Sequence, residues 1–177
     1  MARHRDAADR YRIAPRGSSP KGLAAFAFSP LRPDDVGRIS EIEKLCFRYP
    51  WSRQSFEEVV QSRTFGTIAA RDRGDTVIGY IIFSEVVDEL HVLNVAVHPE
   101  YRRRGIATAL LTSLHKMALE RGRAFAYLEV RESNKAAQAL YLKFGYKPLT
   151  KRKAYYSDNH EDAVIMTAPL KKRFFSR

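Results

Sequence analysis

The stretch HPEYRRRGIATALL (residues 98–111) sets the interpretation of the whole chain. Three arginines, Arg102 to Arg104, stand directly before Gly105, and an apolar pattern of helical period follows. The start of a helix is already the positive end of its dipole, so acidic residues are preferred there. Positive charge at this place favours an anion from outside the chain, bound by the unpaired amides of the first helical turn. The alternative is a solvated arginine-rich surface beside an ordinary helix start.

The segments on either side of this stretch predict strands. Residues 90–97 precede it, and residues 124–130 follow the helix predicted over 105–121. A strand, a helix and a second strand in this order predict a βαβ unit with a right-handed crossover. Further strands are predicted by apolar or alternating runs, at 23–28, 64–71, 76–84, 146–156 and 163–170. With one helix opened by Pro33-Asp34, one starting near Ser52 and one after Asn134, the order β-α-α-β-β-β-α-β-α-β-β predicts one mixed α/β domain.

Local signals support the three remaining helices. Ser52 suits an N-cap, and Trp51 and Phe56 stand where a hydrophobic staple would form. Asn134 suits the N-cap of the last helix and Gly145 its C-terminal end. The helix opened by Pro33-Asp34 has an apolar face of period 3 to 4, predicted from Val36, Ile39, Ile42 and Leu45.

Charge is distributed unevenly along the chain. The net charge is +11, of which residues 1–22 carry +4 and residues 171–177 carry another +4. The Gly-, Ser- and Pro-containing segment 1–22 has no periodicity and is interpreted as a disordered basic arm. Residues 23–170 form the predicted domain, and 171–177 a basic tail. These extensions are expected to be solvated, with weak contact to RNA or a ribosome as the alternative.

Composition excludes several classes of protein. A single cysteine, Cys46, rules out a disulfide framework and indicates a reducing, cytoplasmic compartment. The five histidines have no metal-ligand spacing, so no metal is expected, and no apolar run is long enough for a membrane span. Residues 102–107 form neither a P-loop nor a dinucleotide fingerprint, because the required further residues are missing. Cys46 could serve as a nucleophile, but an inert buried thiol is the ordinary role of a free cysteine.

Residues 102–107 resemble the Q/R-x-x-G-x-G/A signature of the GNAT superfamily of acetyl-CoA-dependent N-acetyltransferases. Within it, an ordered set of segments resembles the RimI subfamily, the ribosomal-protein-alanine N-acetyltransferases. The set is YPWS (49–52), LNVAV (93–97), LEVR (128–131), SN (133–134), ALY (139–141), YY (155–156) and EDAVIM (161–166). The resemblance covers residues 23–170. It implies a mostly antiparallel twisted sheet of about seven strands with about four helices and a V-shaped split between strands 4 and 5.

The resemblance also implies that acetyl-CoA is the cosubstrate. Its pyrophosphate would lie on the amides of the loop, and its pantetheine arm would pair with the free edge of strand 90–97 like an added strand. Asn134 matches a cofactor-contacting position, while its alternative role is the helix cap. The implied cofactor-binding residues are Val95, Ala96, Val97, Arg102, Arg103, Arg104, Gly105, Ile106, Ala107 and Asn134.

Two residues match the catalytic positions of the family. Glu129 matches the general base, and alternation places it on the same strand face as Tyr127. Partial burial would strengthen this carboxylate as a base acting through water; the alternative is an exposed carboxylate paired with Arg131. Tyr141 matches the general acid toward the departing sulfur, although it also falls on an apolar helix stripe. A thiol with a pKa near ~8.5 is a tolerable leaving group, so the Tyr141 hydroxyl is helpful rather than indispensable.

The acceptor amine implied by the resemblance is the N-terminal alanine of a small-subunit ribosomal protein. An α-amino group has a pKa near ~8 and a lysine side chain near ~10.4, so the neutral amine is far more abundant at a protein N-terminus. Four aromatic residues are candidates for contacting an extended peptide, with simple packing as the alternative: Tyr49, Trp51, Tyr155 and Tyr156. Competing functions are acetylation of a lysine or small amine, and a non-catalytic RNA- or ribosome-binding module.

Overall fold

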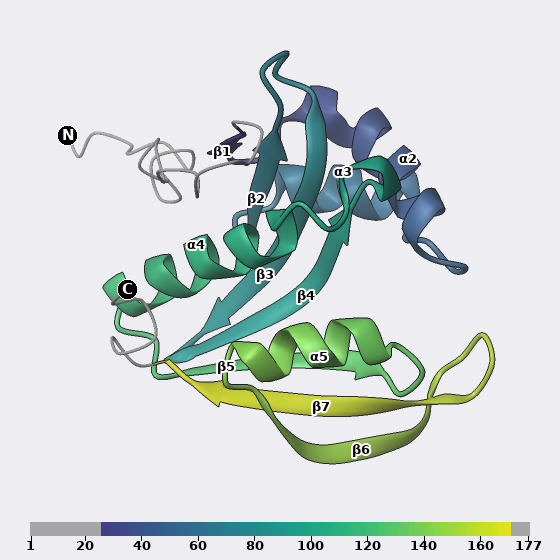
Figure 1. The fold of residues 1–177 in the computed structure, drawn as a ribbon, viewed down its shortest axis with the longest axis vertical. Helices are drawn as coiled ribbons and strands as arrows, with labels where there is room; N and C mark the ends of the chain where they lie inside the picture. The colour runs from purple at the N-terminus through teal and green to yellow at the C-terminus, as the bar shows by residue number, and fades with distance from the viewer. Residues whose placement is uncertain (1–25, 171–177) are drawn as a thin grey trace. The chain divides into compact units, whose positions relative to one another are not determined.

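The computed structural model describes residues 26–170, in which the elements follow the predicted order (Figure 1). The strands are β1 (Ala27–Ser29), β2 (Phe65–Arg71), β3 (Val77–Val86), β4 (Glu89–Val97), β5 (Phe125–Arg131), β6 (Lys147–Tyr156) and β7 (Glu161–Pro169). The α-helices are α2 (Val36–Cys46), α3 (Arg53–Gln61), α4 (Ile106–Glu120) and α5 (Lys135–Lys143), with short 3-10 turns η1 (Pro33–Asp35) and η2 (Pro99–Tyr101). The predicted arm 1–22, the first part of strand 23–28 and the tail 171–177 lie outside the described residues. Among residues 26–170, no helix is long and apolar enough to cross a membrane.

The seven strands form one sheet in the order β1-β2-β3-β4-β5-β7-β6. β4 and β5 pair in parallel, whereas the β1–β2, β5–β7 and β6–β7 pairs are antiparallel. The parallel register runs from Glu89↔Phe125 to Val92↔Leu128, although β4 continues to Val97 and β5 to Arg131. Pairing therefore stops partway along both strands, and this confirms the predicted split and the predicted fold class.

The predicted apolar face of α2 is wrong at its last turn. Leu45 is 56% exposed, whereas Glu43 is buried together with Val36 and Ile39. At 3.6 residues per turn, a stripe that starts at Val36 and Ile39 reaches position 43 and then Cys46, so it passes beside position 45. Val36, Ile39 and Ile42 are buried as predicted, and the carboxylate of Glu43 shares the inner face of α2 with them.

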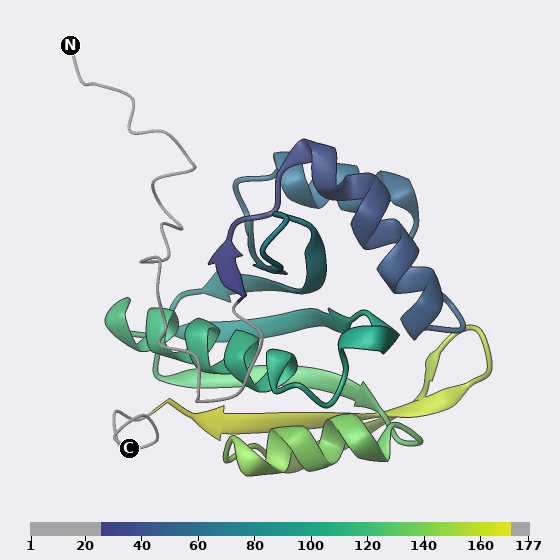
Figure 2. The same cartoon turned by 45° about the horizontal axis from the view of Figure 1, so that its top comes forward.

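The described residues form two compact units, the first made of residues 26–82 and 94–113. In this unit α2 and α3 pack beside one another (Figure 2) over a core that includes Ile39, Ile42, Phe56, Tyr80 and Ile82. The predicted N-cap of α3 is confirmed, because Ser52 Oγ accepts a hydrogen bond of 3.0 Å from the Ser55 amide. The predicted staple is also confirmed by the rings of Trp51 and Phe56, whose centroids are 5.8 Å apart.

The second unit contains residues 83–93 and 114–170. Its β5–β7–β6 ladder has α5 beside it (Figure 1). Asn134 Oδ1 caps α5 by accepting from the Ala137 amide at 3.1 Å. Gly145 ends the helix with φ of 82°, and the Tyr146 amide reaches back to the Tyr141 carbonyl at 3.1 Å. This is a Schellman cap, and it confirms both predicted ends of the helix.

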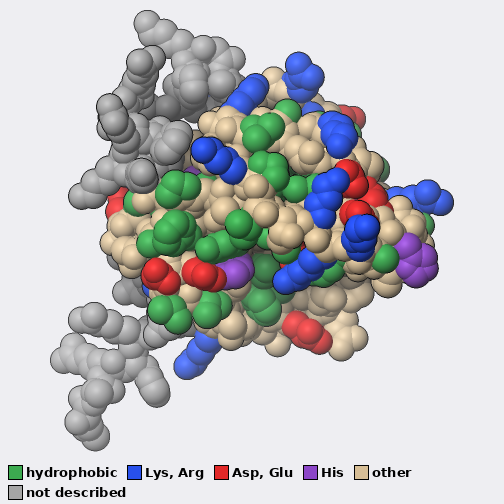
Figure 3. Space-filling view, turned by 90° about the horizontal axis from the view of Figure 1, so that it is seen from below, with side chains coloured by type: hydrophobic (Ala, Val, Ile, Leu, Met, Phe, Trp, Pro, Cys, Tyr) green, Lys and Arg blue, Asp and Glu red, His purple; other side chains and the backbone are tan. Residues whose placement is uncertain are grey.

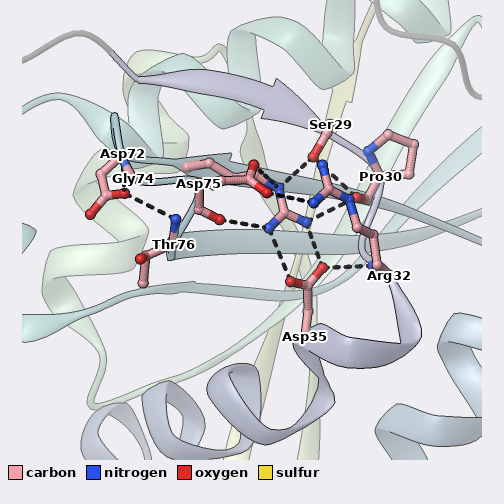
Figure 4. A network of polar contacts seen from close by, with 9 residues as sticks. Ser29, Pro30, Arg32, Asp35, Asp72, Gly74, Asp75 and Thr76 are labelled. Carbon is pink, nitrogen blue, oxygen red and sulfur yellow. Dashed lines mark hydrogen bonds and ion pairs between the residues drawn. The ribbon is translucent and has the colours of Figure 1, made fainter.

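A network of polar contacts holds the edge of the first unit together (Figure 4). The guanidinium of Arg71 donates to both carboxylate oxygens of Asp35, at 3.0 and 2.5 Å, and to Ser29 Oγ at 2.7 Å. It also donates to the main-chain carbonyl of Asp75 at 3.0 Å. Arg71 thus links β2 to β1, to η1 and to the β2–β3 turn. Both side chains of the Arg71–Asp35 pair are largely shielded from solvent.

We expect Asp35→Ala to lower the free energy of unfolding by about 3 kcal/mol, because it leaves a buried guanidinium without its main counter-ion. Urea denaturation followed by circular dichroism measures this loss. Glu57→Ala is the matched control, since it breaks an exposed pair with Arg53 and should cost less than about 1 kcal/mol. Equal losses in the two variants would contradict a special role for the Arg71 network.

A second buried polar contact lies between α4 and the start of β6, inside the second unit. His115 is 2% exposed, and its Nε2 lies 2.8 Å from the hydroxyl of Tyr146, which is also buried. Burial lowers the pKa of His115 to about 4 and raises the pKa of Tyr146. The ring is therefore neutral in the folded chain at neutral pH.

The unfolded chain should take up a proton at His115 between pH 6.5 and pH 4, where the folded chain does not. We therefore expect the free energy of unfolding to fall as the pH drops through this window, by at most about 1.4 kcal/mol per pH unit. His115→Gln, which keeps a hydrogen-bonding side chain but cannot titrate, should remove this part of the slope. Denaturation at several pH values checks it, and a slope in His115→Gln equal to that of the parent chain would contradict this account.

Candidate active site

The arginine-glycine loop lies in the first unit, directly before α4. The first main-chain bond of the helix joins the Ala109 amide to the Gly105 carbonyl at 2.9 Å, so the amides of residues 106–108 precede the intrahelical ladder. Gly105 has φ of 76°, a conformation that glycine adopts without strain. The Arg102 amide is different, because it donates to the Pro99 carbonyl at 3.2 Å. The loop can therefore offer an anion the amides that follow Arg102, but not that of Arg102 itself.

The three arginine side chains do not behave alike. Arg102 turns toward the end of β4, where its Nε donates to the Val97 carbonyl at 3.2 Å and its Nη2 lies 3.2 Å from Cys46 Sγ. Arg104 lies over the ring of Tyr101, with its guanidinium carbon 5.2 Å from the centroid. Arg103 and Arg104 are exposed and remain as cations beside the helix start.

The end of β4 lies close to Gly79 of β3, a residue that the sequence analysis did not single out. A Cβ on Gly79 would lie 3.0 Å from the Ala96 carbonyl oxygen and 3.3 Å from Ile106 Cγ2. Position 79 therefore admits no side chain without displacement of the β4 main chain or the first residue of α4. Cys46 is half-buried, whereas the sequence predicted a buried, inert thiol. Its thiol donates a hydrogen bond to the Val97 carbonyl at 3.3 Å.

The candidate base lies on β5 in the second unit. Alternating burial along β5 confirms that Glu129 shares a face with Tyr127 and not with Leu128. The guanidinium of Arg131, the alternative partner of Glu129, binds Asp158 at 2.7 Å and Glu161 at 3.2 Å.

Glu129 instead pairs with a cation on β6. Its Oε1 lies 2.5 Å from Arg152 Nη1, and about a third of its side chain, 31%, is exposed. The Tyr155 hydroxyl also bonds Glu129, and this contact is the main reason that the pKa of Tyr155 is raised. The carboxylate is thus held from two sides while still open to solvent. Nothing in the sequence around Arg152 signalled this contact, since β6 and β5 meet only through β7.

The strand β6 is an exposed edge with a basic character. Nearly all its residues are solvent-exposed, and the lysines and arginine among them are Lys147, Lys151, Arg152 and Lys153. Lys151 pairs with Glu132 at 2.5 Å. Figure 3 views the molecule from below Figure 1 and shows Lys and Arg side chains gathered close to acidic ones. Basic and acidic groups are therefore interleaved on this face.

Two further tyrosines, Tyr141 and Tyr156, belong to the same unit as the candidate base. Burial raises the pKa of Tyr141 to about 12, with a smaller contribution from Tyr156. The pKa of Tyr156 is likewise raised to about 12, first by burial, although the Arg131 guanidinium over its ring opposes the shift. Both hydroxyls remain protonated at neutral pH. The Tyr141 ring also packs on the Tyr146 ring, so this residue contributes to the core independently of any role of its hydroxyl in proton transfer.

The aromatic residues of the loop between α2 and α3 have different surroundings. Tyr49 is 42% exposed and has the Arg48 guanidinium beside its ring. Trp51 packs on Phe56, as described above, and its amide donates to Glu43 Oε1 at 3.1 Å. The structure therefore brings Glu129, Tyr141, Tyr155 and Tyr156 together within the second unit. It brings Val97, Arg102 and Cys46 together within the first.

Comparison with known proteins gives the family. A sequence model of the "Acetyltransferase (GNAT) family" matches residues 36–146. The ribosomal protein bS18-alanine N-acetyltransferase of Escherichia coli (strain K12) is 36% identical over 144 residues, covering 80% of this chain and 96% of that protein. The N-alpha-acetyltransferase of Saccharolobus solfataricus is 35% identical over 158 residues, covering 82% and 93%.

Solved structures agree with this comparison. The crystal structure of the ribosomal-protein-S18-alanine N-acetyltransferase from Escherichia coli has a TM-score of 0.76 at 35% identity, covering 83% of this chain and 95% of that one. Arabidopsis thaliana NAA60 in complex with a bisubstrate analogue has a TM-score of 0.77 at 22% identity and shares the fold. The matched residues, the identities and the interrupted β4–β5 pairing together show that this chain belongs to the GNAT family of acetyltransferases, enzymes that use acetyl-CoA.

Proposed function

We propose that this chain transfers the acetyl group of acetyl-CoA to the N-terminal α-amino group of a protein, the N-terminal alanine of ribosomal protein bS18. Relatives that are 35–36% identical over most of the chain are named for that reaction. The observation that carries the proposal is Glu129, a partly exposed carboxylate on β5 that Arg152 and Tyr155 hold in place.

Residues of the first unit would bind acetyl-CoA. The pyrophosphate would accept hydrogen bonds from the amides between Arg103 and Ala107, with the helix dipole and the guanidinium groups of Arg103 and Arg104 adding favourable charge. The pantetheine arm would pair with the main chain of residues 95–97. Because the Val97 carbonyl already accepts from Arg102 and Cys46, we expect this pairing to use mainly the groups of Val95 and Ala96. Asn134 can contribute only in addition to its cap.

Residues of the second unit would carry the proton transfers. The neutral amine attacks the thioester carbonyl, the C–S bond breaks, and the amine proton passes to Glu129, directly or through water. Tyr141, protonated at neutral pH, would donate a proton to the departing thiolate. An α-amino group with a pKa near ~8 is neutral about a few hundred times more often at pH 7 than a lysine side chain, so one carboxylate is an adequate base for it.

Aromatic side chains would contact the acceptor peptide. Tyr49 and Tyr155 each have more than two fifths of their surface exposed, so they are available to an extended chain. Trp51 and Tyr156 are half-buried, so the part of the peptide contact that they form would have less conformational freedom. We assign the acetyltransferase domain to residues 23–170. The arms 1–22 and 171–177, with a net charge of +4 each, are proposed to contact RNA or the ribosome weakly.

We expect Glu129→Gln to lower kcat on an Ala-initiated bS18 peptide by about 10²–10⁴-fold, because the amide cannot accept the amine proton. Mass spectrometry of peptide incubated with acetyl-CoA measures the rate. Glu132→Gln is the control, since it removes an exposed carboxylate three residues further along the chain and should stay within about twofold of the parent. Full activity in Glu129→Gln would remove the base assignment.

The same assay tests the acceptor. A peptide with a free N-terminal alanine and an internal lysine should be acetylated at the α-amino group, and a peptide with a blocked N-terminus should not react. Transfer to lysine alone would contradict the proposed function and favour a side-chain acetyltransferase. No transfer to any amine, with retained binding of RNA, would favour a non-catalytic binding module.

Two glycines with the same backbone conformation test the loop. Gly105 has φ of 76° before α4, and Gly122 has φ of 75° after its end. Alanine at either position costs about 1–2 kcal/mol of backbone strain. We expect Gly105→Ala to weaken CoA binding by about tenfold, whereas Gly122→Ala should leave it unchanged, because a Cβ there meets nothing within 4 Å. Isothermal titration with CoA measures both, and equal affinities would contradict the loop assignment.

A further inference from the structure

The first unit buries a carboxylate that the proposed chemistry does not use. Glu43, on the inner face of α2, is 1% exposed. Three hydrogen-bond donors surround it: the Trp51 amide, the Asn94 side-chain amide and the Tyr80 hydroxyl. Taking a carboxylate out of water is costly, and it is tolerated only when hydrogen bonds replace the lost solvation. The burial of Glu43 is unfavourable by itself, so the question is which parts of the structure its hydrogen bonds stabilise.

The carboxylate is satisfied on both oxygens. Oε1 accepts from the Trp51 amide at 3.1 Å and from Asn94 Nδ2 at 3.1 Å. Oε2 accepts from Asn94 Nδ2 at 3.2 Å and from the Tyr80 hydroxyl. Burial raises the pKa of Glu43, while its three donors oppose that shift. Tyr80 and Asn94 come from β3 and β4, so they fix the carboxylate to the sheet.

The remaining contacts show what the carboxylate holds. The main-chain carbonyl of Glu43 accepts from the Phe47 amide at 2.9 Å, where α2 ends. The side chain of the same residue accepts from the Trp51 amide, one residue before the N-cap of α3. Glu43 therefore binds both ends of the loop 47–51, its carbonyl the first residue and its carboxylate the last.

We propose that Glu43 is a positioning residue for the acceptor peptide, which holds the loop 47–51 so that Tyr49 and Trp51 are presented in one fixed conformation. This inference rests on the proposed function, in which these aromatics contact the peptide. Glu43 itself is shielded from substrate, so it acts only through the loop. Its loss should weaken the binding of peptide and leave the binding of acetyl-CoA, which depends on other residues, unchanged.

Four variants separate this role from simple core stability. Glu43→Leu keeps the volume but removes the acceptor for Trp51, and Glu43→Asp keeps the charge but shortens the side chain by one methylene. Glu43→Gln keeps one oxygen that can accept from the Trp51 amide, so this variant should retain the loop conformation and the peptide binding of the parent. Tyr80→Phe is the matched control, because it removes a donor to the same carboxylate and leaves the loop contact intact.

The kinetic test compares the change in KM for the peptide with the change in KM for acetyl-CoA. For Glu43→Leu we expect KM for the Ala-initiated peptide to rise at least tenfold, with KM for acetyl-CoA within about twofold of the parent. Glu43→Asp should show a smaller rise, and Glu43→Gln and Tyr80→Phe should stay near the parent in both constants. If Glu43→Leu does not fold, the comparison of Glu43→Asp with Glu43→Gln decides the same question.

The fluorescence of Trp51 gives a readout that needs no activity. It is the only tryptophan of the chain, so quenching by acrylamide reports on this loop alone. We expect quenching to increase in Glu43→Leu and Glu43→Asp but not in Tyr80→Phe, measured well below each unfolding temperature. A fall in stability shared by all variants, with unchanged quenching and peptide KM, would overturn the proposal. If the parent chain acetylates no N-terminal peptide, the proposed function fails and this inference fails with it; a parent that is active beside an unaffected Glu43→Leu refutes the inference alone.

Discussion

The early end of the β4–β5 pairing is the constraint on which the rest of the structure depends. Both strands continue past Val92 and Leu128 without the parallel ladder, so each carries a stretch of main chain that this neighbour does not pair. Main-chain groups left in this way need other partners. On β4 the Val97 carbonyl takes Arg102 and Cys46, and on β5 the continuation carries Glu129, which is still paired on its other side to β7. The residues assigned to chemistry thus lie where regular pairing ends.

In the first unit, the buried side chains of Arg71 and Glu43 are each satisfied by several partners from different elements. Arg71 joins β1, η1 and the β2–β3 turn, Glu43 joins α2 to β3, β4 and the following loop, and His115 meets Tyr146. Networks of this kind are rigid when complete and costly when one member is removed. They fix the ends of loops and strands more strictly than apolar packing would, because a hydrogen bond tolerates little change in distance and angle.

Sequence patterns predicted the elements and their order because local signals were strong. Ser52, Asn134 and Gly145 lie at the helix ends that their chemistry favours, and alternation along β5 placed Glu129 on the correct face. The apolar face of α2 was predicted correctly at Val36, Ile39 and Ile42 but not at Leu45, and the burial of Glu43 was not predicted. Arg152 escaped prediction for another reason: its contact to Glu129 spans two strands that are far apart in sequence, and no local pattern carries such information. Roles in cofactor and peptide binding rest on the family resemblance and stay predictions.

The loop 47–51 is bonded at both ends to one residue, Glu43, so the position of its ends does not depend on the side chains that it exposes. Because the bonds to Glu43 come from main-chain amides at either end, the side chains at the intervening positions do not help to fix where the loop begins and ends. Arg48 and Tyr49 can therefore change during divergence without disturbing the helices on either side. Substitutions at the exposed positions of this loop can therefore change the surface that it presents, while the carboxylate of Glu43 still accepts from the Trp51 amide.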